Sequence, residues 1–451
     1  MKLKGKIAWS IGAVAVCIIL FIVIKRWNIW FGNPVEPPYA TQQIPNHILL
    51  TFGQNGTDTR AVTWQCDSTL QDACIEYTIE NSDDTICLSA SGEKFTSEGG
   101  SSIFYRAEIP VSAAGNYSYR IRHPHVQSDW HRFSVHDAEK DQPIEFIYLG
   151  DIQDTIGGIT GQITRNIVTR YPQTQFFVLG GDFIHRPLET YWDEAFRGID
   201  TIAGSYPILA VSGNHEYYKG LNKKAEMRFP LHFAYYLDTY RETGYCFYTA
   251  RYGDAELYLI DSNANIIRLW QQRNALKKAL AQSQAKWKIV VLHHPPYSIR
   301  KPHNNLDVKL LFAGLFNRYN VDLVLAGHEH GYARRNARTL NSRPTVPVYT
   351  VSHCSPKQYP LYIGDAERYG TGDRYYQRVV IHGDTLQMST YTIDDCLYDR
   401  IELTKEDGKT ILTDLSNGIP EQLEMPAEVA KRIKQGALHE YRKSIDERTR
   451  K

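Results

Sequence analysis

The chain has 451 residues, too many for one ordinary compact domain, so its length predicts two domains with additional segments. Its 51 Lys and Arg residues balance 50 Asp and Glu residues, which argues against the basic excess of a nucleic-acid-binding protein. Hydrophobic residues make up 42% and charged residues 22% of the chain, values typical of a globular protein. We therefore expect no nucleic-acid partner, whereas a small anionic substrate needs only local positive charge, which metal ions supply.

An apolar run occupies residues 7–24, with three lysines before it and Lys25 and Arg26 after it. The run is long for the core of a signal peptide and just long enough to span a bilayer. No small-x-small cleavage site follows it, so we predict a signal anchor over residues 1–30, with a cleaved signal peptide as the alternative. Either reading predicts an exported body, which is membrane-anchored in the periplasm or at the cell surface, or secreted after cleavage.

A Pro-containing linker over residues 31–43 precedes a stretch with the pattern of an all-β sandwich, residues 44–138. Short runs here alternate apolar and polar residues and are separated by clusters of Gly, Asn, Asp and Ser. No ionisable cluster in this stretch has catalytic spacing, so we expect a spacer or packing role. The predicted strands are 48–52, 61–65, 74–80, 103–109, 117–123 and 131–135.

The seven cysteines are few for this length, and three of them, Cys66, Cys74 and Cys87, lie close together in sequence. An exported chain allows one pair among these three to oxidise. Free and partly buried thiols are the alternative, and the absence of a CxxC pattern argues against a zinc knuckle.

Residues 143–392 alternate short apolar runs with helix-like segments, which predicts a layered α/β domain. Several apolar runs end in Gly or Asp, and ligands in such folds bind beyond the carboxyl ends of the strands. The predicted strands are 144–149, 176–179, 208–211, 257–260, 289–292 and 321–325, and the predicted helices are 160–170, 267–282 and 307–319.

The C-terminal extension, residues 393–451, differs in composition from the domain before it. Residues 426–450 are rich in Ala, Glu, Lys and Arg, which favours a helix. We expect this helix to lie on the surface, exposed to solvent.

Five short polar motifs end or follow predicted strands, and each places metal-ligand types beside a buried strand. Carboxylate, amide oxygen and imidazole together suit Fe, Zn or Mn, and a bridging carboxylate holds two cations about 3.5–4 Å apart. A single Gly-Asp is usually a turn, but five such motifs in this order are hard to explain as turns. They are Gly150-Asp151-Ile152-Gln153, Gly181-Asp182-Phe183-Ile184-His185, Gly213-Asn214-His215-Glu216, Val290-Val291-Leu292-His293-His294-Pro295 and Gly327-His328-Glu329-His330.

This ordered set resembles the calcineurin-like metallophosphoesterases. The preceding β-sandwich and the His-x-Pro form of the fourth motif are similar to those of purple acid phosphatases. The resemblance covers about residues 44–392 and implies a fibronectin-III-like sandwich followed by a four-layer metallophosphoesterase sandwich.

The resemblance implies two metal ions that share Asp182 as a bridging ligand. Asp151 and His330 would bind the first metal. The second metal would be bound by three residues that follow other strands: Asn214, His293 and His328. Hydrolysis would then proceed by direct attack of a metal-activated hydroxide on the phosphorus, without a covalent phospho-enzyme.

Two further histidines, His215 and His303, are candidate catalytic residues that are not assigned to a metal. His215 follows the ligand Asn214, and His303 lies ten residues after His293, at a place similar to that of a substrate-facing histidine in purple acid phosphatases. Either ring can stabilise developing charge or protonate the leaving alkoxide near neutral pH. An exposed loop position is the alternative for His303, and His294 is expected to point away from the site.

The first metal site departs from the resemblance at His185. Purple acid phosphatases carry Tyr at this position, three residues after the bridging Asp, and its phenolate gives them their colour. Other members of the superfamily have His two residues after the first Asp, where this chain has Gln153. We therefore favour His185 as a replacement ligand, with one ligand fewer as the alternative, and a colourless pair of divalent ions.

The predicted function is the hydrolysis of small phosphate esters by an enzyme resembling acid phosphatases. A phosphodiesterase or nucleotidase with the same metal site is the alternative, since pocket shape decides the substrate. A membrane-tethered binding protein without catalysis is the alternative from another class, and the nearly complete ligand set argues against it.

Overall fold

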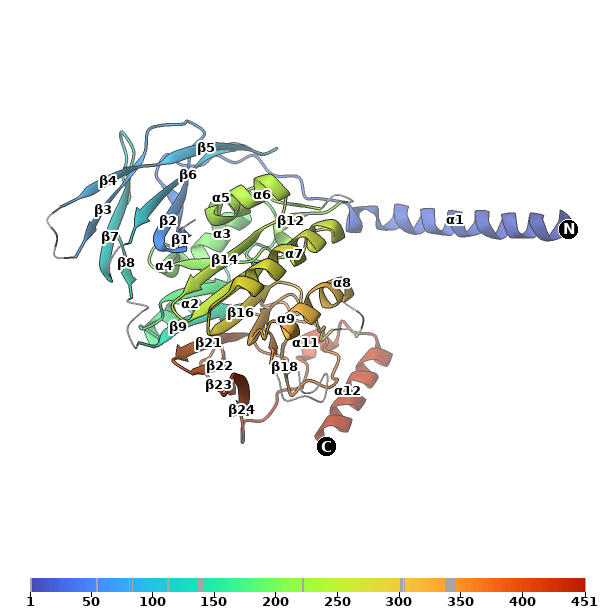
Figure 1. Cartoon of the computed structure of the whole chain (residues 1–451). Helices are drawn as coiled ribbons and strands as arrows, with labels where there is room; N and C mark the ends of the chain where they lie inside the picture. Colours follow the sequence, from blue (N-terminus) through green and yellow to red (C-terminus); the bar gives the residue numbers. More distant parts are fainter. Residues whose placement is uncertain are drawn as a thin grey trace.

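The computed structural model describes residues 2–53, 56–80, 82, 84–111, 114–136, 142–220, 223–300, 303, 305–336 and 346–450. Helix α1 (Lys2–Trp30) extends away from the body of the molecule (Figure 1). Within the residues searched, no helix combines the length and the apolar character needed to cross a membrane. The predicted anchor includes side chains outside the described set, at residues 2–12, 15, 29 and 30, and stays a prediction.

The segment expected to be a free linker is instead fastened to the body. Glu36 is buried, and its Oε1 lies 2.5 Å from a guanidinium nitrogen of Arg228. The Asn33 side chain donates to the carbonyl of Lys219 (3.0 Å) and accepts from its backbone N–H (2.7 Å). These contacts join residues more than 180 positions apart, which no local sequence pattern reveals.

Residues after this segment form two antiparallel four-stranded sheets that pack on each other (Figure 1). Trp64 lies in the shared core and stacks on Tyr105 with ring centroids 5.4 Å apart. The expected strands are present, and the structure adds β4 and β5. In spatial order the first sheet contains β1 (Asn46–Gly53), β2 (Gly56–Cys66), β6 (Ser101–Pro110) and β5 (Ser91–Thr96). The second contains β4 (Ile86–Ser89), β3 (Cys74–Ile79), β7 (Gly115–Arg122) and β8 (His131–Val135).

The cysteines are free thiols in this structure, including the three that the sequence offers for a disulfide. Cys74 and Cys87 lie on the paired strands β3 and β4, where Cys74 faces Ser89 and Cys87 faces Glu76. Burial raises the pKa of the Cys66 thiol to about 12, so this side chain is an unreactive part of the core.

The α/β domain contains two seven-stranded sheets. In spatial order the first contains β11 (Ile208–Ala210), β10 (Phe176–Leu179), β9 (Ile144–Leu149), β21 (Tyr375–His382), β22 (Thr385–Thr392), β23 (Leu397–Glu406) and β24 (Lys409–Asp414). The second contains β14 (Phe247–Tyr252), β15 (Ala255–Ile260), β16 (Trp287–Leu292), β17 (Leu323–Ala326), β19 (Val348–Val351), β18 (Tyr332–Asn336) and β20 (Arg368–Gly370).

Alternating side chains of the second sheet face two different cores, which explains why its strands read as continuous apolar runs. Leu257 and Leu259 of β15 belong to the large core that also contains residues of the first sheet. Tyr258 and Ile260 face the other way, into the core formed with α7 (Ile266–Gln282) and α9 (Gly314–Arg318). The layers of this domain therefore follow one another as helices, sheet, sheet and helices, which agrees with the four-layer sandwich expected from the sequence.

Helices cover the outer faces of the sheets (Figure 1). The helical core behind the second sheet includes Leu276 of α7 and Phe316 of α9. The helices near the first sheet are α2 (Thr160–Arg170), α3 (Glu189–Gly198) and α4 (Asp200–Ala203). A hairpin of β12 (Tyr217–Tyr218) and β13 (Lys224–Ala225) precedes the helices α5 (Arg228–His232) and α6 (Leu237–Thr243). The helices associated with the second sheet are α7 (Ile266–Gln282), α8 (Leu306–Val308) and α9 (Gly314–Arg318).

The C-terminal residues are more integrated than the sequence indicates. The expected domain boundary at residue 392 is wrong, because β23 pairs with β22 and β24 pairs with β23 in the first sheet. The charged tail forms α11 (Ala427–Ala430) and α12 (Gln435–Thr449). α12 is mostly exposed, as expected, but its Tyr441 is buried against Leu423.

Parallel pairing brings the carboxyl ends of several strands to common edges. Strands β9, β10 and β11 are parallel in the first sheet, and β15, β16, β17 and β19 are parallel in the second. The polar motifs of the sequence follow these ends, so the fold gathers them between the two sheets.

Candidate metal centre

Four candidate ligands hold a left-handed backbone conformation directly after their strands. Their φ angles are 45° for Asp151, 50° for Asp182, 71° for His328 and 48° for His330. Residues other than Gly rarely adopt these angles, and each costs roughly 1–3 kcal/mol unless the surroundings enforce it. The concentration of such residues at one place marks a site whose geometry is imposed by the fold.

Two glycines allow the ligand loops to approach each other. A Cβ at Gly213 would lie 2.1 Å from both the backbone nitrogen and Oδ1 of Asp182. A Cβ at Gly327 would lie 2.2 Å from Oδ2 of Asp151. The glycines of these motifs are therefore required by contact with the two carboxylates, as well as by the turns.

The first group of ligand atoms belongs to Asp151, Asp182 and His330, which lie within 4.8 Å of one another and are buried. His330 Nε2 is 3.5 Å from Asp151 Oδ1, and that oxygen has no hydrogen-bond partner among the described residues. Burial raises the pKa of the Asp151 carboxyl well above its usual range, and the charge of Asp182 adds to this effect. A cation between these groups would give Asp151 Oδ1 a partner and would neutralise the buried carboxylate charges. This donor set therefore fits a metal ion.

The second group surrounds Nε2 of His293. Asp182 Oδ1 lies 3.4 Å from this nitrogen, Asn214 Oδ1 3.3 Å and His328 Nδ1 3.2 Å. His293 Nδ1 lies 2.9 Å from the carbonyl of Gly180, which only accepts, so the imidazole proton belongs on Nδ1. A neutral His293 therefore presents a lone pair to atoms that are mainly acceptors, and a shared cation satisfies them together.

The two imidazoles deepest in the site are oriented in the same way. Nδ1 of His330 donates to the carbonyl of Lys357 (2.8 Å), which leaves Nε2 facing Asp151. Burial opposes protonation of His293, but the carboxylates of Asp182 and Asp151 outweigh it and raise its pKa to about 10. Protons and metal ions therefore compete for this nitrogen.

Buried glutamates adjoin the ligands in two of the motifs and fix the neighbouring loops. Glu216 accepts from the backbone N–H groups of Asp182, Ile184 and Gly213 at 2.9, 3.0 and 2.6 Å. Glu329 accepts from Ser298 Oγ and Arg300 N, both at 2.9 Å. Both glutamates stand in the quoted motifs, but their roles depend on loops distant in sequence.

His294 is a correction to the sequence analysis, which expected it to face away. Ligand atoms of His293, His294 and His328 lie within 4.8 Å of one another, and the rings of His294 and His328 have centroids 4.2 Å apart. Ser262 holds the residue, because its Oγ contacts both the backbone N (2.9 Å) and Nδ1 (3.1 Å) of His294. Burial lowers its pKa to about 3, so the ring is neutral.

His185 lies beside the centre but outside the first group of ligand atoms. Its Nδ1 is 3.3 Å from Gln153 Oε1, and Gln153 Nε2 is 3.3 Å from Asp182 Oδ2. Gln153, which was considered only as a missing ligand, therefore connects His185 to the shared carboxylate. Burial and the neighbouring His215 lower the pKa of His185, with smaller effects of Arg186 and Lys357. Ligation by His185 stays a prediction.

The two predicted catalytic histidines differ in position. His215 donates its backbone N–H to Asp182 Oδ1 (2.9 Å), and its Nε2 lies 3.8 Å from Asp182 Oδ2. Its Nδ1 contacts the carbonyl of His185 (2.5 Å), so Nε2 is the atom that faces the centre. His303 is exposed between β16 and α8, and its neighbours 301, 302 and 304 fall outside the described residues, so its role stays a prediction.

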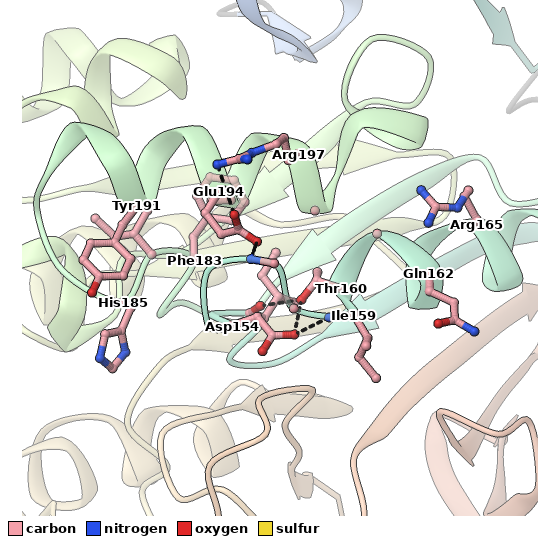
Figure 2. Close-up of a pocket in the computed structure, with 17 residues that line it drawn as sticks. Asp154, Ile159, Thr160, Gln162, Arg165, Phe183, His185, Tyr191, Glu194 and Arg197 are labelled. Carbon is pink, nitrogen blue, oxygen red and sulfur yellow. Dashed lines mark hydrogen bonds and ion pairs between the residues drawn. The ribbon is translucent and has the colours of Figure 1, made fainter. Parts of the chain in front are cut away.

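A pocket of about 290 Å³ opens beside the centre, and His185 forms part of its wall. Figure 2 shows His185 and Tyr191 at one end and Gln162 and Arg165 at the other. Asp154 shapes the floor by accepting from Ile159 N (3.0 Å) and Thr160 Oγ1 (3.2 Å). The pocket offers space for a small organic group next to His185.

Comparisons with known proteins agree with this geometry. Residues 125–332 match the family described as Calcineurin-like phosphoesterase. Purple acid phosphatase 21 of Arabidopsis thaliana is 28% identical over 231 residues, which cover 48% of this chain and 51% of that protein. Purple acid phosphatase 15 of the same plant is 26% identical over 265 residues, covering 56% and 47%. This chain thus spans about half the length of these relatives.

Two further similarities extend over more of the chain. An uncharacterized protein of Mycobacterium tuberculosis is 24% identical over 385 residues, covering 72% of this chain and 68% of that protein. A structure of PhoD superposes with a TM-score of 0.61 at 11% identity, over 91% of this chain and 100% of that chain. At this identity the superposition shows a shared fold.

Proposed function

We propose that this chain, which carries a calcineurin-like phosphoesterase domain related to purple acid phosphatases, hydrolyses phosphate monoesters at the centre described above. The observation that carries the proposal is the convergence of Asp182, Asn214 and His328 on Nε2 of His293 at 3.2–3.4 Å. Such a set of mainly acceptor atoms is suited to a metal ion, with which protons compete for His293 Nε2.

The ligand set supports two metal ions that share Asp182. Asp151 and His330 would hold one ion, and Asn214, His293 and His328 would hold the other. When bound, such a pair activates water and neutralises the negative charge that develops on the phosphoryl group. The chain orients several of these ligands, through backbone carbonyls that hold His293 and His330 and through the buried Glu216 and Glu329, which hold neighbouring loops.

His215 is the side chain best placed to move a proton to the leaving group. Its Nδ1 is held by the carbonyl of His185, and its half-buried ring directs Nε2 toward Asp182. A histidine in this position donates a proton to an alkoxide as the ester bond breaks. Asn214 is exposed at the rim of the centre, so the second metal would be open to substrate.

We infer a divalent metal pair from the residue at position 185. A neutral imidazole, whether as a ligand or beside the ligands, gives less preference for a trivalent ion than the phenolate that purple acid phosphatases have there. The purified metal-loaded protein should be colourless, with about two metal ions per chain by elemental analysis. An intense visible charge-transfer band would contradict this assignment.

Two substitutions test the proposed function: Asn214→Ala removes a ligand and His215→Ala removes the proton donor. Each is expected to lower kcat for an aryl phosphate by at least about 100-fold while thermal unfolding stays similar. Asn274→Ala on α7 and His439→Ala on α12 are matched controls, because both residues are exposed and lie on helices that carry none of the candidate ligands. Unchanged turnover in either test variant would refute the assignment.

A further inference from the structure

Two positively charged side chains share one aromatic ring at the edge of the centre. The guanidinium carbon of Arg300 lies 3.8 Å from the centroid of the Tyr359 ring, and Nζ of Lys357 lies 5.1 Å from the same centroid. The ring attracts each cation, but two like charges held on one ring repel each other. We call Arg300, Lys357 and Tyr359 the Tyr359 cluster.

The cluster is attached to a metal ligand. The ring of Tyr359 meets the ring of His330 nearly edge-on, with centroids 4.9 Å apart and an interplanar angle of 78°. The carbonyl of Lys357 accepts from His330 Nδ1, and the backbone N–H of Arg300 donates to Glu329 beside it. The backbones of Lys357 and Arg300 are therefore held next to the first metal site, and Tyr359 contacts both of their charged side chains there.

In the part of the chain that the structure describes, the charges of the cluster form no ion pair, although the charge of Arg300 acts on the pKa of Glu329. Among the described residues, neither the Arg300 guanidinium nor the Lys357 ammonium lies within 4.0 Å of a carboxylate oxygen, in contrast to Arg334, which is 2.7 Å from Asp399. Glu329 precedes His330 in the sequence and lies beside the cluster. It contacts Arg300 by accepting a hydrogen bond from its backbone N–H.

The oxygens of Glu329 are already occupied. One oxygen accepts from Ser298 Oγ and from the backbone N–H groups of Ile299 and Arg300, and the other accepts from Asn305 Nδ2 (3.1 Å). Glu329, the acid beside the cluster, is therefore engaged by other donors, and neither cation of the cluster forms an ion pair with it.

We propose that the Tyr359 cluster binds a second anionic group of the substrate, so the preferred substrates are phosphate esters that carry a further phosphate or carboxylate. The inference rests on the proposed function, since the first phosphate occupies the metal centre. The metal pair places the scissile phosphate, and the cluster recognises the charge on the leaving-group side. Arg supplies a planar pair of donors and Lys a mobile point charge, a combination suited to phosphate oxygens.

A pair of substrates and two neutral variants test the inference. Phenyl phosphate has a neutral leaving group, whereas a phenylene bisphosphate carries a second phosphate on the same ring. Arg300→Gln and Lys357→Met remove charge but keep most of the side-chain length. Each is expected to raise KM for the bisphosphate by about tenfold with kcat nearly unchanged, since one charge-assisted contact is lost. KM for phenyl phosphate should change by less than about twofold.

Matched controls separate charge recognition from general effects. Arg318→Gln on α9 removes an exposed guanidinium that also lies over a tyrosine ring, 5.9 Å from the centroid of Tyr319, and it should leave both substrates unaffected. Arg300→Lys should restore most of the preference for the bisphosphate, because it restores the charge. In the wild type, added salt should weaken the preference.

The possible outcomes distinguish the two proposals. If phenyl phosphate is hydrolysed but Arg300→Gln and Lys357→Met affect both substrates equally, the cluster binds the scissile phosphate and the inference is overturned. Unchanged kinetics with both substrates would overturn it as well. If the metal-loaded wild type hydrolyses neither ester, the proposed function itself fails, and the inference fails with it.

Discussion

Substitution of Glu216 by Gln tests whether the metal centre depends on the buried carboxylate next to Asn214. Oε2 of Glu216 accepts from the backbone N–H groups of Asp182 and Gly213, and Oε1 accepts from that of Ile184. Glutamine has the same shape but only one acceptor oxygen. Its amide nitrogen must therefore face at least one backbone N–H, donor against donor.

The expected cost follows from these contacts. One buried N–H without an acceptor costs about 1–3 kcal/mol. The two remaining hydrogen bonds change from charge-assisted to neutral. This change about halves their strength and adds a cost of roughly 1 kcal/mol for each bond. The total of about 3–5 kcal/mol falls on the loop that holds Asp182, the proposed shared ligand, so we expect metal affinity to fall by about 100-fold or more and the unfolding midpoint to drop.

The assay is titration of the metal-free protein with Zn²⁺ or Mn²⁺, combined with thermal unfolding, at about pH 8, because burial raises the pKa of Glu216 to about 7. Glu242→Gln, an exposed substitution on α6, is the matched control. Glu216→Gln with unchanged metal affinity and an unchanged unfolding midpoint would refute the reasoning that this carboxylate organises the centre.

Two further predictions concern a glycine of the centre and a buried acid outside it. Gly213→Ala should displace the Asp182 carboxylate and lower metal affinity by about tenfold or more, whereas Gly314→Ala, whose Cβ meets nothing within 4 Å, should not; equal behaviour of the two variants would count against the close approach. Burial raises the pKa of Glu226 from 4.5 to about 7, so the stability it contributes is complete below about pH 4.5 and is lost as pH rises through 7, by about 3 kcal/mol. Denaturant unfolding across this range should show a flatter pH dependence for Glu226→Gln than for the wild type; parallel curves would exclude this linkage.

The sequence was sufficient to predict which side chains the fold brings together, because most of these candidate ligands follow strands with clear patterns. Asp151, Asp182 and His293 come shortly after buried apolar runs, and parallel pairing within each of the two sheets brings the carboxyl ends of these strands to a common edge. The other candidate ligands, Asn214, His328 and His330, are predicted from the order and spacing of the motifs. The same logic does not apply to side chains whose orientation is fixed by distant loops.

Three features show why the remaining details were missed. His294 turns toward His328 because Ser262, on another loop, contacts both its backbone and its ring. β23 and β24 join the edge of the first sheet by antiparallel pairing. Many residues of β24 are exposed, so its sequence lacks the apolar run that indicates a buried strand. The sequence around Glu36 predicts a free linker, because its partner Arg228 is distant in the sequence.

The attachment of residues 33–36 gives the N-terminal helix a mechanical connection to the centre. Asn33 is paired with Lys219, five residues after the candidate ligand Asn214, and Glu36 meets Arg228 in the buried interior. Glu36 also accepts from the backbone N–H of Glu189 at the start of α3 (2.8 Å). A pull on α1 would therefore load the Asn214 loop and α3 before it reached the β-sandwich, so tension at the N-terminus is transmitted toward the mouth of the centre.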